Sequence, residues 1–383
     1  MADNTAAKDA LASEGTGWKR KEQPTGLLSG KVSSKAARVR LQELVIYTRQ
    51  LATMISAGIP LLEALEILAE QQDNAGFKSV CEDVVADVRG GSDLSTALSQ
   101  HPRVFEDIYV NMVRAGEVSG QIDEILIRLA EYLEATAKLR GQIISAMTYP
   151  VISLVLILGI VMFLLLVIVP KFQEIFKSMN IKLPWITQAL LDLAEFMTTQ
   201  WMIWVPGVIG AAVLLRAYTK TTIGRRHMDW LKLNAPIFGP LFKKVALSRF
   251  SRTFATLISS GVPILGALEI VASTSGNVLI EEVVLEASES VRQGETLASP
   301  LAEKPKLFPP MVTRMIAIGE KSGALEALLL KISEFYDQQV EQAVEQLTSL
   351  IEPIMICVMG ILVGGMVLAI FLPIFELQKQ LQQ

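Results

Sequence analysis

Hydrophobic positions recur every three or four residues along most of this chain, which is the spacing of one helix face. In the stretch from Thr48 to Leu68, TRQLATMISAGIPLLEALEIL, the spacing runs on both sides of a Gly-x-Pro break. Gly58 is placed where a left-handed residue ends a helix, and Pro60 where the next helix starts. Strand-like alternation is nearly absent, so the pattern predicts an all-α protein.

The chain repeats this pattern 203 residues later. The stretch from Ser251 to Val271 reads SRTFATLISSGVPILGALEIV. Matching residues continue at the same offset, without a gap, over roughly 130 positions, which indicates duplication of one unit. The matched pairs include Gly58 and Gly261, Pro60 and Pro263, Glu117 and Glu320, Gly120 and Gly323, Pro150 and Pro353, and Pro170 and Pro373.

Three apolar runs are candidates to cross a bilayer, whose hydrocarbon core takes about 20 helical residues. Met147 to Pro170 has no charged residue, and Leu350 to Pro373 has only Glu352. Trp201 to Lys220 is shorter, with tryptophans at one end and Arg216 near the other. We expect transmembrane helices at 146–171, 199–218 and 349–373.

Basic residues predict the orientation of these spans. Lys138 and Arg140 precede the first span, and Arg216, Lys220, Arg225, Arg226 and Lys232 surround the end of the second. Residues 171–198 carry three lysines against three acids. By the positive-inside rule, the N-terminus is cytoplasmic and the C-terminus lies on the opposite side.

The repeat and the spans together predict the domain organisation. It is an all-α membrane protein with two repeated cytoplasmic helical-bundle domains and three transmembrane helices, and the final helix of each bundle runs on into a span. The bundles are expected at 41–145 and 219–348, and residues 172–198 and 374–383 are expected as a loop and a tail on the far side. Polar residues 1–40 are expected to be disordered: a solubilising tail is favoured over a lipid contact.

Motifs for catalysis or metal binding are missing from the sequence. There is no GxxxxGK[ST], HExxH or GxSxG motif, and no cluster of Cys and His. The net charge of −4 gives no support for binding nucleic acid. We predict no catalytic residue, no cofactor and no metal, and therefore no enzyme.

The repeated motifs supply the candidate functional residues. The candidates for partner contacts or structural turns are Arg49, Gly58, Pro60, Glu117, Gly120, Arg252, Gly261, Pro263, Glu320 and Gly323. Glu117 and Glu320 are interpreted as carboxylates that complete a helix N-terminus. The alternative is a contact or a cation ligand at a module interface. The Gly-x-Pro turns are interpreted as structural.

Four further candidates lie in the spans. Pro150 and Pro353 are predicted to kink their helices, and a hinge is the alternative. Gly360 and Gly364 form a GxxxG pattern, which lets helices approach closely in lipid and favours a homo-oligomer packed around the third span. The first and third spans hold almost no polar residues at membrane depth, so a transporter or channel is a distant alternative.

Several stretches together resemble a known family. YTRQLATMISAGIPLLEALEIL, GEVSGQIDEIL, MTYPV, PKFQEIFKSMNIKLPWITQ, FPPMVTRMIAIGEKSGALEALL and LAIFLPIFEL are similar to the inner-membrane platform protein shared by type IV pilus and type II secretion machines. The resemblance covers roughly residues 41–380 and favours the pilus branch. A type II secretion platform is the alternative.

The resemblance carries expectations about location and partners. It implies a bacterial inner-membrane protein with a periplasmic loop and tail, and an assembly or retraction ATPase in the cytoplasm as motor. It also implies contacts with pilin or pseudopilin subunits, with inner-membrane alignment proteins and with the lipid bilayer. Some secretion relatives bind calcium, but their ligands do not map onto this chain, so no metal is assigned.

Overall fold

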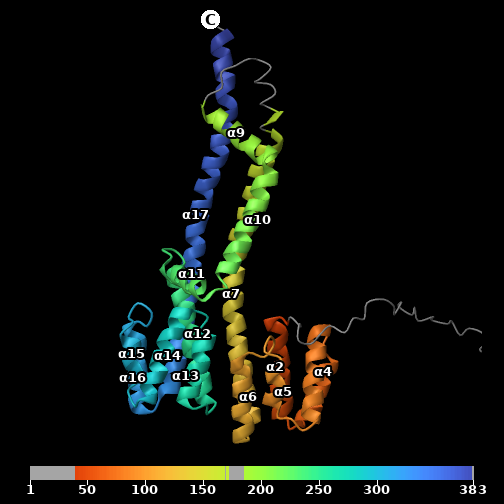
Figure 1. The fold of residues 1–383 in the computed structure, drawn as a ribbon, viewed down its shortest axis with the longest axis vertical. Helices are drawn as coiled ribbons and strands as arrows, with labels where there is room; N and C mark the ends of the chain where they lie inside the picture. The colour runs from red at the N-terminus through yellow and green to blue at the C-terminus, as the bar shows by residue number, and fades with distance from the viewer. Residues whose placement is uncertain (1–38, 169, 172–184, 382–383) are drawn as a thin grey trace, which may run out of the picture.

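The computed structural model describes residues 39–168, 170–171 and 185–381. Over these ranges the chain is helical and contains no strand, which confirms the predicted all-α class. Two helical bundles lie side by side at one end of an elongated molecule, and long helices extend from them toward the other end (Figure 1). Residues 1–38, most of the segment expected to be disordered, lie outside the described residues.

The first bundle is built around an aromatic core. Tyr47 and Phe77 meet edge to face, with ring centroids 5.3 Å apart, and Phe105 and Tyr109 pack at 4.9 Å. All four are almost fully buried. The bundle comprises α2 (Leu41–Ser56), α3 (Leu61–Glu70), α4 (Ala75–Arg89), α5 (Leu94–Ser99), α6 (Asp107–Ser119) and the first part of α7 (Ile122–Phe163).

The second bundle repeats the first with the 203-residue offset. Its elements are α12 (Gly239–Ser259), α13 (Ile264–Thr274), α14 (Val278–Arg292), α15 (Ala298–Ala302), α16 (Pro310–Ser322) and the first part of α17 (Leu325–Leu381). The bounds of α14 and α16 are those of α4 and α6 shifted by the offset, and α17 starts where α7 does. The duplicated motifs therefore encode duplicated helix ends.

The repeated glycines end helices in left-handed conformations. Gly58 and Gly261 have φ of +84° and +79°, and Gly120 and Gly323 have φ of +73° and +72°. A side chain at such φ is strained, so glycine is the residue that terminates a helix here. Asn74 and Asn277, also related by the offset, cap α4 and α14 with their side-chain oxygens.

Two helices are long and apolar enough to cross a membrane. They run from Ile122 to Ile168, through α7 and a π-helical turn, η2 (Leu164–Ile168), and from Leu325 to Ala369 within α17. Each continues from the core of its bundle into the apolar run without a break. The π-helical turn ends two residues before Pro170, whose ring cannot fit a regular α-helical turn.

The region of the second span differs from the prediction. The predicted loop at 172–198 contains a helix, α9 (Trp185–Thr199), which meets α10 (Trp201–Tyr218) at a bend of 73°. Thr187, Leu191 and Ala194 give α9 a buried face at helical spacing, and the last two pack near Leu165. The loop prediction weighed charge alone and missed this pattern. Residues 172–184 lie outside the described residues.

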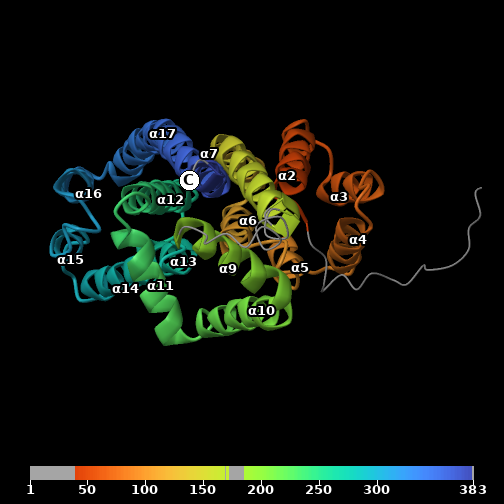
Figure 2. The ribbon, with the colours of Figure 1, turned by 90° about the horizontal axis from the view of Figure 1, so that it is seen from above.

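The C-terminal tail also differs from the prediction. Instead of ending near Pro373, α17 continues to Leu381. A proline removes one backbone donor and crowds the preceding turn, but a long helix supported on both sides can tolerate it. Seen from above, α7 and α17 run next to each other between the two bundles (Figure 2).

Candidate functional site

The two bundles are joined along a junction formed by α7, α12 and α17. Inside the junction the Tyr132 hydroxyl lies 3.3 Å from Thr253 Oγ1. At its surface, Arg128 NH1 pairs with Glu326 Oε1 at 3.6 Å. The buried side chains of both bundles belong to one continuous hydrophobic cluster. The repeats therefore form one packed body.

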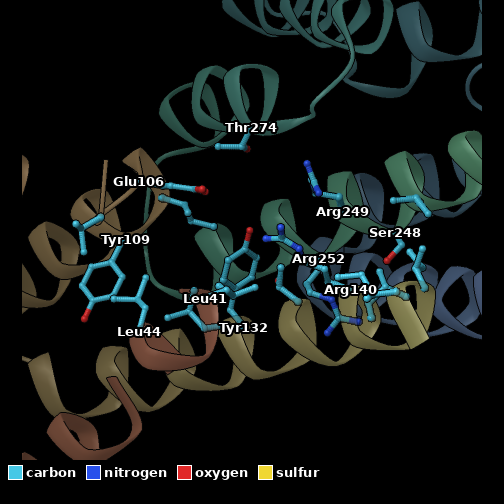
Figure 3. A pocket seen from close by; sticks show the side chains of 18 residues that line it. Leu41, Leu44, Glu106, Tyr109, Tyr132, Arg140, Ser248, Arg249, Arg252 and Thr274 are labelled. Atoms are coloured by element: carbon cyan, nitrogen blue, oxygen red, sulfur yellow. The ribbon is translucent and has the colours of Figure 1, made fainter. Parts of the chain in front are cut away.

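A cavity of about 330 Å³ opens at this junction, between α2, α6, α7, α12 and α13 (Figure 3). Arg140, Arg249 and Arg252 contribute side chains to its lining, with Glu106 as its one carboxylate. Arg252 is neutralised by an ion pair with Asp337. Within the described ranges, no ion pair holds Arg140 or Arg249. The cavity thus has an excess of positive charge.

Arg252 and Arg49, which the sequence singled out, occupy equivalent places in the two repeats. Arg49 Nε and NH2 donate to the two carboxylate oxygens of Glu134 at 2.6 and 2.7 Å. Arg252 binds Asp337, which also accepts a hydrogen bond from the Ser248 hydroxyl. Each pair ties the first helix of a bundle to its last helix. The arginines therefore act within the chain in this structure.

The electrostatics of the two pairs differ because their burial differs. The hydrogen bonds from Arg49 hold the pKa of Glu134 below its ordinary value. Burial lowers the pKa of Arg252, whose side chain is only 15% exposed. A guanidinium stays charged in either setting. The second pair is thus a charge pair held largely out of water.

Glu117 and Glu320 both bind the start of a neighbouring short helix. Glu117 accepts the backbone N–H of Ser95 in α5 at 3.2 Å. Glu320 accepts that of Leu297, just before α15, at 2.9 Å. A carboxylate there satisfies a free donor and complements the helix dipole. The helix they complete is not their own, because both glutamates sit near the C-terminal ends of α6 and α16.

The remaining candidates of the repeats have local structural roles. Pro60 and Pro263 directly precede α3 and α13. Neither Gly58 nor Gly120, nor their counterparts Gly261 and Gly323, approaches another element, and their positive φ alone accounts for the residue type. A role of these positions in partner binding stays a prediction.

The candidates in the spans lie on continuous helices. Pro150 is within α7 and Pro353 within α17. A Cβ added at Gly360 or Gly364 would meet nothing within 4 Å. That helix surface is open in a single chain, as a packing face between chains would be. The kink and the homo-oligomer stay predictions.

Sequence analysis missed the acids at this site. Glu134 and Asp337 lie in the middle of long helices and match no functional motif. Their offset of 203 residues, the same as that of Arg49 and Arg252, was the available signal. No group of three or more potential metal ligands occurs among the residues the structure describes.

Comparison with known proteins decides the family. The sequence model of the family described as type II secretion system (T2SS), protein F, matches twice, over residues 47–170 and 250–373. The two matches are again separated by 203 residues and together cover more than half of the chain. The chain belongs to the type II secretion system protein F family. This confirms the resemblance found in the sequence.

Similar curated proteins of this family carry two kinds of name. The type IV pilus assembly protein PilC of Thermus thermophilus is 46% identical over 337 residues, 88% of this chain and 83% of that protein. The PilC of Myxococcus xanthus is 42% identical over 342 residues, covering 89% and 82%. The type II secretion system protein F of Xanthomonas campestris is 34% identical over 362 residues, covering 92% and 89%.

Proposed function

We propose that this member of the protein F family is the inner-membrane platform of a type IV pilus assembly machine. The observation that carries the proposal is the similarity to the two pilus assembly proteins over more than four fifths of both chains. In this role the bundles receive movement from a cytoplasmic ATPase, and the spans pass it to pilin subunits that enter the filament.

The long helices support such a role mechanically. α7 and α17 each begin in a bundle core and continue into an apolar run. Leu126 and Leu129 of α7, and Leu329 and Ile332 of α17, are fully buried in the bundles. A displacement of the bundles would thus be carried into the membrane by helices anchored in both places.

The proposed partners follow from this arrangement. The chain has no predicted nucleotide site, so the energy would come from a separate assembly or retraction ATPase. Pilin or pseudopilin subunits and inner-membrane alignment proteins would meet the spans or the periplasmic segments. The open face at Gly360 and Gly364 is where a second copy would pack. The proposed topology has the N-terminus in the cytoplasm and the C-terminus in the periplasm.

Deletion of the gene in its own host tests the proposal. We expect cells without surface pili, with pilin accumulating in the membrane, and rescue by the full chain. Normal piliation would contradict it. The runner-up is a type II secretion platform, which the 34% identical Xanthomonas protein supports. For that function, deletion would block the release of secreted enzymes and leave piliation intact.

A further inference from the structure

Helix α11 (Thr222–Asn234) presents an apolar face that the described chain leaves uncovered. Gly224, Asp229 and Leu233 form its buried side. On the opposite side Ile223 is 65% exposed, and Trp230 is 56% exposed. The apolar surface continues past the helix end, where Leu231, Ile237, Phe238 and Phe242 are exposed as well. Large apolar side chains gathered on one helix face indicate a binding surface.

The orientation of this face is fixed by contacts on the buried side. Asp229 Oδ2 accepts the backbone N–H of Val278 at the start of α14, at 3.1 Å. Arg225 and Arg226 pair with Glu281 and Glu282 of the same helix, at 3.4 and 3.3 Å. α11 is therefore fastened to the second bundle, and its outward face cannot turn inward without breaking these contacts.

The same helix is held at the end of the second candidate span. Only four residues separate the start of α11 from the end of α10 at Tyr218. A Cβ on Gly224 would lie 1.9 Å from the Tyr218 carbonyl oxygen, so the turn is too tight for any other residue. The Tyr218 hydroxyl also lies 2.8 Å from His227 Nδ1. α11 thus begins where the span leaves the apolar layer.

Packing places the corner between α11 and α12 at the same level as the other two spans. Leu241 belongs to a small cluster with Val344 and Leu347, against which Ala146 also packs. Leu347 precedes the third apolar run by three residues, and Ala146 directly precedes the first. Figure 2 shows α11 lying across the long axis of the molecule. That is the orientation of a helix on a membrane surface.

Charge identifies what this surface binds. Residues 216–244 hold seven lysines and arginines and a single acid, Asp229. Two of the seven are paired with glutamates of α14, and the others surround the apolar face. A basic helix with tryptophan among exposed apolar residues fits a bilayer with anionic headgroups, whose attraction grows with each nearby basic residue.

We propose that α11 and the α11–α12 corner lie in the headgroup layer of the membrane and bind anionic phospholipid. Trp230, Leu231 and Phe238 enter the boundary of the acyl chains, and Lys220 and Lys243 meet the phosphates. This contact holds the second bundle against the bilayer at a fixed angle. The first bundle has no equivalent helix among the residues that the structure describes.

Spin labels on the full-length protein test the proposal. A single cysteine at Trp230 or Leu231 is introduced after Cys81 and Cys357 have been replaced by alanine, and the labelled protein is reconstituted in vesicles. Oxygen, which concentrates in lipid, and a water-soluble nickel chelate report what surrounds the label. Glu82, exposed on α4 of the first bundle, is the matched control position.

We expect the labels at Trp230 and Leu231 to show a severalfold higher ratio of oxygen to nickel accessibility than the label at Glu82. The ratio rises when phosphatidylglycerol is added to phosphatidylcholine, and Lys220→Gln with Lys243→Gln reduces that rise. Nickel access equal to the control overturns the proposal, and so does a ratio that ignores anionic lipid. Shielding from both reagents overturns it too, because the face then meets a second copy of the chain.

Discussion

Arg49 and Glu134 join the first and last helices of the first bundle through two parallel hydrogen bonds of 2.6 and 2.7 Å. The second bundle repeats the relationship with Arg252 and Asp337. Their exposures differ: the side chains of the first pair are 37% and 42% exposed, and those of the second are 15% and 28% exposed. Duplication has preserved the contact, while the two copies have acquired different surroundings.

The difference in burial predicts unequal costs of removing the acid. Glu134→Gln should lower the free energy of unfolding by at most about 1 kcal/mol, because water screens a half-exposed pair. Asp337→Asn should cost about 2 kcal/mol, since it leaves a largely buried guanidinium without its counter-charge. Thermal unfolding of the purified protein in one detergent compares the two. Equal shifts would contradict the assignment.

The first pair also predicts a dependence on pH. Hydrogen bonds from Arg49 lower the pKa of Glu134 from its ordinary 4.5, so the folded pKa lies below the unfolded one. Such a group stabilises the fold fully above pH 4.5 and loses that contribution as the pH falls through the folded pKa. The stability gap between wild type and Glu134→Gln should therefore shrink in acid. A gap that widens below pH 4.5 would contradict this.

Two repeat-related glycines allow a close approach of helices that alanine would obstruct. A Cβ on Gly116 would lie 3.1 Å from Ile125 Cβ, and one on Gly319 would lie 2.9 Å from the Leu325 Cα. Backbone yields less than a side chain, so Gly319→Ala should destabilise more than Gly116→Ala, within about 1–3 kcal/mol.

The matched control for these variants is Gly141, also within a helix. A Cβ there meets nothing within 4 Å, so Gly141→Ala should stabilise by up to about 1 kcal/mol through helix propensity. Unfolding midpoints of the three variants give the order. If Gly319→Ala proved as harmless as Gly141→Ala, the close contact between α16 and α17 would be refuted.

Glu117 and Glu320 provide a test between a structural and a partner-binding role. Glutamine keeps a hydrogen-bond acceptor for the Ser95 or Leu297 N–H, whereas alanine removes it at a cost of about 1 kcal/mol. We expect the glutamine variants to keep normal piliation and nearly normal stability. Loss of ATPase co-isolation with unchanged stability would instead assign these carboxylates to a partner surface.

The repeated bundles could be predicted from the sequence because their signals are local. The Gly58-x-Pro60 break, the helix-ending Gly120 and their second copies define helix ends within a few residues, and hydrophobic spacing defines the buried faces. Position 203 residues later repeats each decision. Elements that carry such signals, from α2 to α6 and from α12 to α16, lie where the pattern indicated.

The candidate site could not be predicted in the same way because it depends on tertiary contacts. Nothing near Arg49 in the sequence points to Glu134, which lies 85 residues later. The cavity arginines Arg140 and Arg249 come together only when the two bundles pack. α9 was missed because charge balance was used to assign a loop, although its apolar spacing is helical.

The central claim is that both repeats form one body on the cytoplasmic side of the membrane. Ser92 and Glu295 are exposed, equivalent positions of the two repeats, and each can carry a single cysteine in the protein that lacks Cys81 and Cys357. A membrane-impermeant thiol reagent is applied to spheroplasts and to inverted membrane vesicles. We predict that both cysteines react only in the inverted vesicles. Reaction of either one from the outside of spheroplasts would contradict the account.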